Sequence, residues 1–272
     1  MKHFYPILSV ALSALFAFTA CDTIDFEDRL DGPIEVEVGK NILIEDYTGQ
    51  KCANCPLAHA EAEKLQELYG KDKIIAVAIH GGPQAVDEGN SVQVGLANET
   101  GKEYNRRLGS FAYPKGIVDR QGGLSDYEKW NTSIVSRLTQ KSPVNLSVQA
   151  IEVDEPSRFL SFTCKVESRQ AIDGQLQVWL TESNIQAVQA LPAQWGGGYQ
   201  SDYVHNHVFR AAVNGIDGIS LSLGKDESAN KNYAYTLADD WNIRNMHLVI
   251  FYYNETDGVL QVIETPLVQP NP

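Results

Sequence analysis

The sequence predicts an α/β domain followed by an all-β domain. Between residues 38 and 142, short apolar runs alternate with segments whose apolar residues recur every three or four positions, which is typical of strands alternating with helices. After residue 143, apolar and polar residues alternate one by one, which is typical of strands in an antiparallel β-sandwich. A chain of 272 residues is long enough for two such domains.

In the first domain, residues 42–44 predict a strand and residues 58–69 predict a helix with one apolar face. Gly70 ends this helix, since glycine is favoured just past a helix. Residues 74–79 are apolar without a break, which indicates a strand buried on both faces of a parallel sheet. This strand–helix–strand order predicts a right-handed crossover.

The rest of the first domain is less regular. Residues 92–108 predict one or two helices, and residues 114–119 predict a further strand. Ser125 and Glu128 have the spacing of a capping box, so we expect the last helix of this domain to begin there.

In the second domain, apolar residues alternate with mostly polar ones over residues 160–166. This spacing puts Cys164 on the inward face of a strand and predicts a buried thiol that behaves as a small hydrophobic group. Residues 246–253 and 259–263 flank a turn-forming segment and predict a β-hairpin.

The N-terminus predicts export and lipidation. The apolar stretch at residues 7–20 is shorter than a membrane span and ends in small residues directly before Cys21. This ending resembles a bacterial lipobox, although Phe18 stands where leucine is usual. We therefore expect a signal peptide at 1–20, lipid on Cys21 and an acidic tether at 21–37. An ordinary secretory peptide is the alternative.

The composition is acidic, with 22 Lys and Arg residues against 35 Asp and Glu residues and a formal net charge of −13. Such a surface repels phosphate backbones, so we expect no nucleic-acid partner. Besides Cys21 there are three cysteines, which is too few for a dense disulfide framework. We expect the domains to be held together by their apolar cores.

The chemistry is predicted at Cys52 and Cys55, which are separated by two residues and lie between a predicted strand and a predicted helix. The free N–H groups and the dipole at a helix start stabilise a thiolate. The thiolate is the attacking species in disulfide exchange. We predict that Cys52 is the exposed nucleophile and that Cys55, one turn further in, is the resolving thiol.

This arrangement resembles thioredoxin-like proteins, because Tyr113 and Pro114 precede a further strand in that family's order. The resemblance implies that the peptide bond before Pro114 is cis, that Pro114 lies against the disulfide, and that Tyr113 helps to bind substrate. Asp46 lies six residues before Cys52, which is the spacing of the family's buried proton acceptor. The adjacent Glu45 is the alternative for this role.

Two features differ from that family. Lys51 stands where thioredoxin has tryptophan, and a cation there would further favour the thiolate. The chain around residues 81–106 is longer than the minimal fold requires, which indicates an insertion. His80 ends a buried strand at the edge where α/β sites usually lie, so we predict that it binds substrate. A structural hydrogen bond is the alternative role for His80.

Residues 48–56, 78–81 and 203–210 resemble recurrent segments of the lipoprotein family known as outer membrane protein 28. This resemblance implies an outer-membrane or cell-surface location. It also implies an α/β thioredoxin-like domain at 38–142 followed by an all-β immunoglobulin-like sandwich at 143–272. The predicted partners are thiols or disulfides of exported proteins, and no cofactor is expected.

The main alternative is a permanent disulfide between Cys52 and Cys55, since oxidation is the default outside the cytoplasm. The protein would then be a surface binding module or adhesin. Its ligand surface would include the glycine-rich loop at residues 195–199 and Tyr203.

Metal and haem sites are less favoured alternatives. A zinc site could combine the cysteine pair with His59 and His80, but structural zinc sites usually have a second paired motif. An attached haem would need histidine where Pro56 stands. His205 and His207 would share one face of a strand and could bind a metal, although strand histidines more often make structural hydrogen bonds.

Overall fold

The computed structural model describes residues 39–109 and 112–269. The predicted signal peptide, Cys21 and the tether lie outside the described residues. The described residues form one compact unit. Within the two described ranges, none of the helices is both long enough and apolar enough to cross a membrane.

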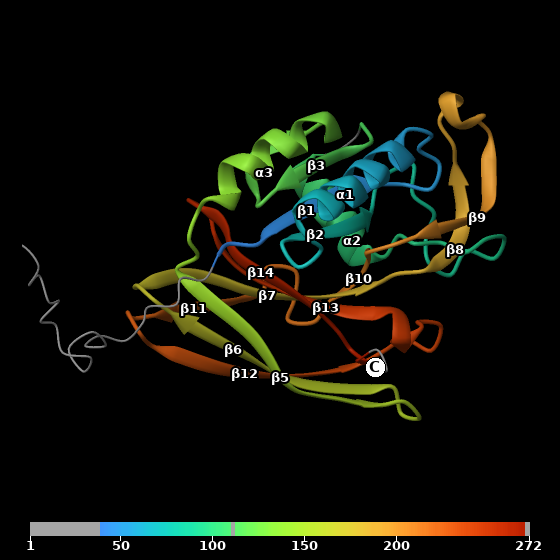
Figure 1. The fold of residues 1–272 in the computed structure, drawn as a ribbon. Helices are drawn as coiled ribbons and strands as arrows, with labels where there is room; N and C mark the ends of the chain where they lie inside the picture. Colours follow the sequence, from blue (N-terminus) through green and yellow to red (C-terminus); the bar gives the residue numbers. More distant parts are fainter. Residues whose placement is uncertain (1–38, 110–111, 270–272) are drawn as a thin grey trace, which may run out of the picture. The chain divides into compact units, whose positions relative to one another are not determined.

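One large sheet contains strands from both halves of the sequence (Figure 1). Its strands run in the order β14-β13-β7-β10-β2-β1-β3-β4, and β11 also pairs with β7. The first half supplies β1 (Ile42–Thr48), β2 (Ile74–His80), β3 (Lys115–Val118) and β4 (Gln121–Ser125). The second half supplies β7 (Ile172–Glu182), β10 (Val208–Ala212), β11 (Ile219–Leu223), β13 (Met246–Asn254) and β14 (Gly258–Pro266).

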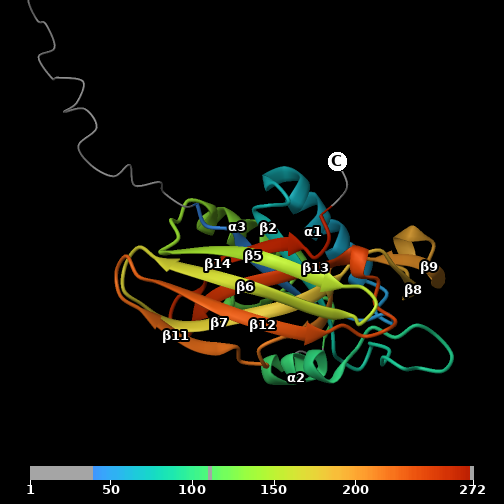
Figure 2. The same ribbon diagram turned by 90° about the horizontal axis from the view of Figure 1, so that it is seen from below.

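Helices cover both faces of the β1–β2–β3 end of this sheet (Figure 2). Helix α1 (Cys55–Tyr69) and helix α3 (Trp130–Leu138) pack on one face, where their apolar side chains form a core with Ile42 and Ile44. Helix α2 (Glu99–Leu108) lies on the other face, where Tyr104 packs near Leu43. Alternate residues of β1 therefore point toward α1 and toward α2.

A second sheet of three strands packs against the large one. Its order is β12 (Ser228–Thr236), β6 (Phe159–Ser168) and β5 (Val144–Asp154). The core between the two sheets consists of apolar side chains, among them Leu180 and Leu248, together with the buried thiol of Cys164. Strands β8 (Ile185–Ala190) and β9 (Tyr199–His205) form a separate hairpin beside α1 (Figure 1).

The predicted fold class is wrong. We expected a thioredoxin-like domain followed by a separate immunoglobulin-like sandwich, but strands from the second half continue the sheet that begins in the first half. Val208 of β10 pairs with Ala78 of β2 in parallel, and the Ala78 N–H donates to the His207 carbonyl at 2.8 Å. This pairing satisfies backbone groups that β2 would otherwise leave open at a sheet edge. The domain boundary near residue 143 stays a prediction.

Several local predictions are confirmed. Strands β1 and β2 pair in parallel, and every residue of β2 is buried. The C-terminal hairpin forms from β13 and β14, and Cys164 is buried on β6. The capping box is wrong, because Ser125 ends β4, where its hydroxyl donates to the Gly116 carbonyl, and α3 begins only at Trp130.

Candidate functional site

The cysteine pair lies where β1 leads into α1. Cys52 and Cys55 form a disulfide with a Cα–Cα distance of 5.4 Å, and Cys55 is the first residue of α1. Pro56 fits in this first turn, because the backbone N–H that proline lacks has no helical partner there. The predicted placement of the pair at a helix start is confirmed.

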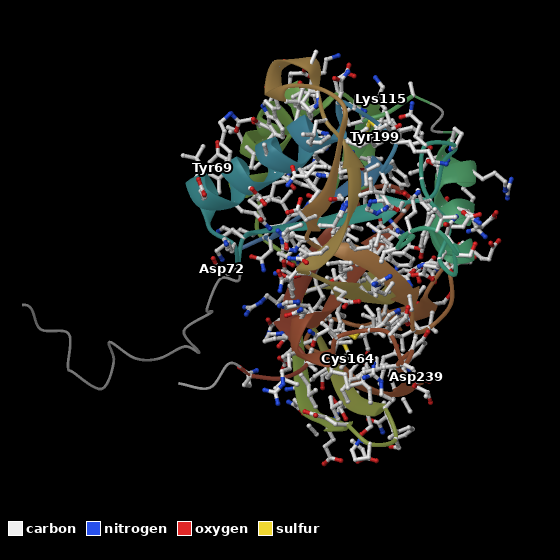
Figure 3. The ribbon with its side chains drawn as sticks, turned by 90° about the vertical axis from the view of Figure 1, so that its right-hand side faces the viewer. Tyr69, Asp72, Lys115, Cys164, Tyr199 and Asp239 are labelled. Carbon is white, nitrogen blue, oxygen red and sulfur yellow. A yellow bond between two sulfur atoms is a disulfide. The ribbon has the colours of Figure 1, made fainter. Side chains whose placement is uncertain are left out.

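The expectation that Cys52 is exposed is wrong, since its relative exposure is 2% and that of Cys55 is 0%. The β8–β9 hairpin covers the pair: the side-chain amide of Gln189 donates to the Cys52 carbonyl at 2.9 Å, and the Ala190 N–H donates to the Gln50 carbonyl at 2.8 Å. Figure 3 shows this hairpin, with Tyr199 labelled, in front of the sheet.

Asp46 lies on the face of β1 that α1 covers. It is 3% exposed, and its Oδ2 atom lies 3.5 Å from Nε2 of His59, one helical turn after Cys55. Burial raises the pKa of Asp46 to about 8. At neutral pH the carboxyl is therefore mostly protonated, and it can gain and release a proton near physiological pH.

Glu45 points to the opposite face of β1. The Tyr47 hydroxyl donates to its carboxylate at 3.0 Å, and Nε of Arg120 donates to it at 2.7 Å. The Arg120 guanidinium also lies over the ring of Tyr253, 4.3 Å from the centroid. Glu45 is thus part of a polar cluster on the α2 side, which leaves Asp46 as the carboxyl beneath α1.

Three histidines from three elements gather beside Asp46. The ring centroids of His80 (β2) and His205 (β9) are 5.6 Å apart, and those of His59 (α1) and His205 are 6.3 Å apart. Burial lowers the pKa of His59 to about 3, lowers that of His205 to about 4, and lowers that of His80 well below its usual range. All three rings are therefore neutral at physiological pH.

His80 is 2% exposed, and neither of its ring nitrogens makes a hydrogen bond of ordinary geometry. The ring nitrogens of His205 are likewise buried and make no hydrogen bond of ordinary geometry. Backbone carbonyls nearby, such as that of Ala78 for His80, favour protonation but do not outweigh burial. The predicted role of His80 in binding substrate stays a prediction.

His205 and His207 do not share a strand face, contrary to the sequence-based interpretation. Strand β9 ends at His205, and His207 has a left-handed backbone with φ of 55°. Its Nδ1 atom lies 3.7 Å from Oε1 of Glu264, whereas His205 points toward His59 and His80. Within residues 39–109 and 112–269, no set of three or more His, Cys, Asp or Glu side chains is arranged to hold a metal ion.

A contact that the sequence did not predict links α1 to β9. The Nδ1 atom of His59 lies 3.0 Å from the Tyr203 hydroxyl, and its Nε2 atom lies 3.0 Å from the Thr48 hydroxyl. A cavity of about 40 Å³ adjoins these groups and is lined by Asp46, His59, Tyr203 and nine other residues. No sequence signal could have found it, because Tyr203 lies 144 residues after His59.

The Tyr113–Pro114 peptide bond is cis, as the resemblance implied. Strand β3 starts at the next residue, Lys115, which pairs with Tyr47 near the end of β1. Pro114 therefore lies at the sheet edge from which the cysteine-bearing loop departs. The Tyr113 hydroxyl donates to Oδ1 of Asn105 at 2.5 Å. The roles of Tyr113 and Pro114 toward a substrate stay predictions.

The fold and the site define a mostly β protein with a cysteine pair at a helix start. The chain belongs to the family described as Outer membrane protein Omp28, whose model matches residues 101–269. It is accordingly an outer membrane protein.

Two solved structures are similar to this chain. HBP35 of Porphyromonas gingivalis has a TM-score of 0.63 and 17% sequence identity, over 86% of this chain and 81% of that chain, which shows a shared fold. A domain of the outer membrane lipoprotein Omp28 from Porphyromonas gingivalis has a TM-score of 0.32 and 20% identity, over 46% of this chain and 87% of that chain. No curated protein matches the sequence.

Proposed function

We propose that this outer membrane protein is anchored by lipid on Cys21 and exchanges disulfides with exported proteins through Cys52 and Cys55. The observation that carries the proposal is Asp46, a buried carboxyl on the α1 face whose pKa is raised to about 8. A permanent disulfide needs no proton acceptor beneath it. A resolving thiol does, because the thiolate is the nucleophile.

In the proposed reaction, the Cys52 thiolate of the reduced protein attacks a disulfide of an exported protein. One substrate sulfur becomes bonded to Cys52, and the other leaves as a thiolate. Cys55 then gives its proton to Asp46 and attacks the Cys52 sulfur, which releases the second substrate sulfur as a thiolate. The substrate disulfide is reduced, the cysteine pair is oxidised, and an external dithiol must reduce the pair again.

Access to Cys52 requires movement of the tip of the β8–β9 hairpin, where Gln189 and Ala190 pair with β9, whereas Tyr203 lies nearer the base. Hydrogen bonds of Gln189 and Ala190, and one from Gln50 to the Val188 carbonyl, hold this part of the hairpin over the pair. Each such bond contributes about 1 kcal/mol net, so local opening costs much less than global unfolding. Pro114 and Tyr113 lie at the same sheet edge, where we propose that the substrate backbone binds.

Reduction of insulin by the full-length protein, with dithiothreitol as the electron donor, tests the exchange function. We expect activity in the wild type, none in Cys52→Ser, and an accumulated mixed disulfide in Cys55→Ser. Cys164→Ala is the matched control, since it removes a cysteine that lies in the other core. Wild-type activity no higher than that of Cys52→Ser would contradict the proposal.

The anchor is tested separately. We expect Cys21→Ala to move the protein from the membrane fraction to the soluble fraction, whereas Cys164→Ala leaves it in the membrane fraction. Unchanged partitioning of Cys21→Ala would contradict lipidation at this cysteine.

A second candidate function is favoured by the burial of both cysteines, at 2% and 0% exposure. In this candidate the disulfide is structural, and the protein binds a partner through the exposed aromatic side chains of Trp195 and Tyr199. A reduction potential below about −300 mV, together with no insulin reduction, would support it over the exchange function.

A further inference from the structure

We propose that protons enter and leave the buried site through a relay of Asp46, His59 and Tyr203, which reaches the surface between α1 and β9. The proposal rests on the proposed exchange function and assigns His59 and Tyr203 as proton-relay residues for it. Neither residue contacts the cysteines through an observed bond, so their role is to move a proton and not to touch the substrate.

The geometry of the relay is continuous across three elements. Oδ2 of Asp46 (β1) lies 3.5 Å from Nε2 of His59 (α1), and Nδ1 of His59 lies 3.0 Å from the hydroxyl of Tyr203 (β9). Tyr203 is partly exposed. The relay therefore connects a carboxyl that is 3% exposed to a residue that is partly exposed.

The longest step of the relay, between Oδ2 of Asp46 and Nε2 of His59, is longer than an ordinary hydrogen bond, so a water molecule would bridge it. The Thr48 hydroxyl lies 3.0 Å from the same His59 nitrogen. The cavity of about 40 Å³ that Asp46, His59 and Tyr203 line is large enough for a water molecule, which needs roughly 10–15 Å³ by the same measure. The exposed residue Glu63 also lines this cavity, so the route ends at solvent.

One oxygen of the Asp46 carboxyl is available to accept a proton. Its Oδ1 atom is buried and makes no hydrogen bond with protein atoms. Leaving a buried polar atom unpaired costs about 1–3 kcal/mol, so a purely structural carboxyl would be expected to have a partner there. In the relay, Oδ1 of the ionised form of Asp46 accepts the thiol proton while Oδ2 faces His59.

Burial and the neighbouring groups keep the imidazole of His59 neutral. The titratable and charged groups facing it are His59 and Glu63 on α1, His80 on β2, Tyr203 and His205 on β9, His207 after β9, and Arg210 on β10. Burial, followed by repulsion from His205 and His207, lowers the pKa of His59 to about 3. His59 therefore does not store a proton as a stable imidazolium. It takes a proton at one nitrogen while it gives up the proton on the other.

The proton of the Cys55 thiol leaves the site as the new disulfide forms. As Cys55 attacks the mixed disulfide, its proton passes to Asp46, the Cys52–Cys55 bond forms, and the bond between Cys52 and the substrate sulfur breaks. Asp46 then gives a proton to Nε2 of His59, the proton on Nδ1 passes to the Tyr203 oxygen, and the Tyr203 hydroxyl proton passes to water. Asp46 returns to the carboxylate, and the substrate disulfide is the oxidant.

A separate proton route is needed because the sulfur side of the site is closed. Gln189 and Ala190 hold the β8–β9 hairpin against the cysteine loop, and a bound substrate would cover the same side. The cavity between α1 and β9 lies on the side of Asp46 and His59. The substrate and the proton therefore use different faces of the site.

The test follows one turnover of the reduced full-length protein with oxidised glutathione, using acid quench and mass measurement of the mixed disulfide. We expect His59→Gln and Tyr203→Phe to slow the resolution step about tenfold or more, because assisted proton transfer contributes at least ~100-fold in many enzymes. The rate of mixed-disulfide formation should not change. Ser201→Ala, which removes an exposed hydroxyl from the same strand outside the cavity, is the matched control and should behave as wild type.

Two further readouts separate a relay from a structural role. Imidazole added to His59→Gly should restore the resolution rate, and raising the pH toward 8 should speed resolution in the wild type but not in Asp46→Asn. Equal resolution rates in wild type, His59→Gln and Tyr203→Phe would overturn the relay and leave the exchange function standing. Slowed resolution without imidazole rescue would also overturn it. A wild type that forms no mixed disulfide would overturn the exchange function and the relay together.

Discussion

The molecule buries sulfur in two regions of very different chemistry. Between the two sheets, Cys164 is surrounded by apolar side chains, and burial raises the pKa of its thiol to about 12. At the start of α1 lies the disulfide of Cys52 and Cys55, and one turn further along the helix His59 faces Asp46 and His205. In Figure 3, Cys164 is labelled at the opposite end of the molecule from Tyr199 on the β8–β9 hairpin.

The two regions differ in the polar groups that surround the buried sulfur. Cys164 has no thiolate at neutral pH, because its core offers little to stabilise a charge. The other region contains one carboxyl oxygen, Oδ1 of Asp46, and ring nitrogens of His80 and His205 that are buried without hydrogen-bond partners, and such groups reduce stability. An apolar core would be more stable there, and the proposed proton transfer would account for the polar groups. Four expected outcomes test this comparison.

The largest pH-independent effect is expected in the apolar core. Leu248 on β13 is fully buried between the sheets, so Leu248→Ala should lower the free energy of unfolding by about 2–5 kcal/mol in denaturant titrations. The exchange rate per folded molecule should stay the same. A slower exchange rate in the folded variant would show that the two regions are coupled.

A pH-dependent effect is expected at Asp46. Its pKa is about 8 in the folded protein and about 3.9 in an unfolded chain, so the folded state binds the proton more tightly. The free energy of unfolding should therefore fall as the pH rises from about 4 to about 8, and each pKa unit is worth about 1.4 kcal/mol.

Asp46→Asn should remove this contribution and gain stability relative to the wild type over the same pH range. Urea titrations of the oxidised proteins at several pH values would measure the difference. A difference between the two proteins that stays constant from pH 4 to 8 would show that Asp46 ionises normally.

A smaller effect is expected at Cys164. Cys164→Ser puts a hydroxyl among apolar side chains and should lower the free energy of unfolding by about 1–3 kcal/mol, with Cys164→Ala as the control for lost volume. Iodoacetamide should not label this thiol in the native protein. Rapid labelling would mean that the core between the sheets opens readily.

The smallest effect is expected at the hairpin. Gln189→Ala removes the hydrogen bond to the Cys52 carbonyl, which contributes about 0.5–1.5 kcal/mol, and should speed reduction of the disulfide by dithiothreitol about 2- to 10-fold. Gln186→Ala changes an exposed residue of the same strand and is the matched control. Equal reduction rates in Gln189→Ala and Gln186→Ala would mean that this contact does not control access to the disulfide.

Much of the site could be predicted from the sequence, because its parts are local in the chain. The apolar run of β2 fits only a strand buried on both faces, and the cysteines lie between a strand and a helix in the sequence itself. The burial of Cys164 followed from strict alternation along β6. These patterns depend on residues only a few positions apart, so they can be recognised in short segments of the sequence.

The joining of the two halves and the covering of the disulfide were decided only by the tertiary structure. Ala78 pairs with Val208, and Cys52 is covered by Gln189, across separations of more than a hundred residues. Backbone N–H and C=O groups are the same in every residue, so the sequence does not mark which strand will pair with an open edge. The same long-range packing buries Asp46 and brings Tyr203 to His59, because desolvation depends on everything that surrounds a group and not on its neighbours in the chain.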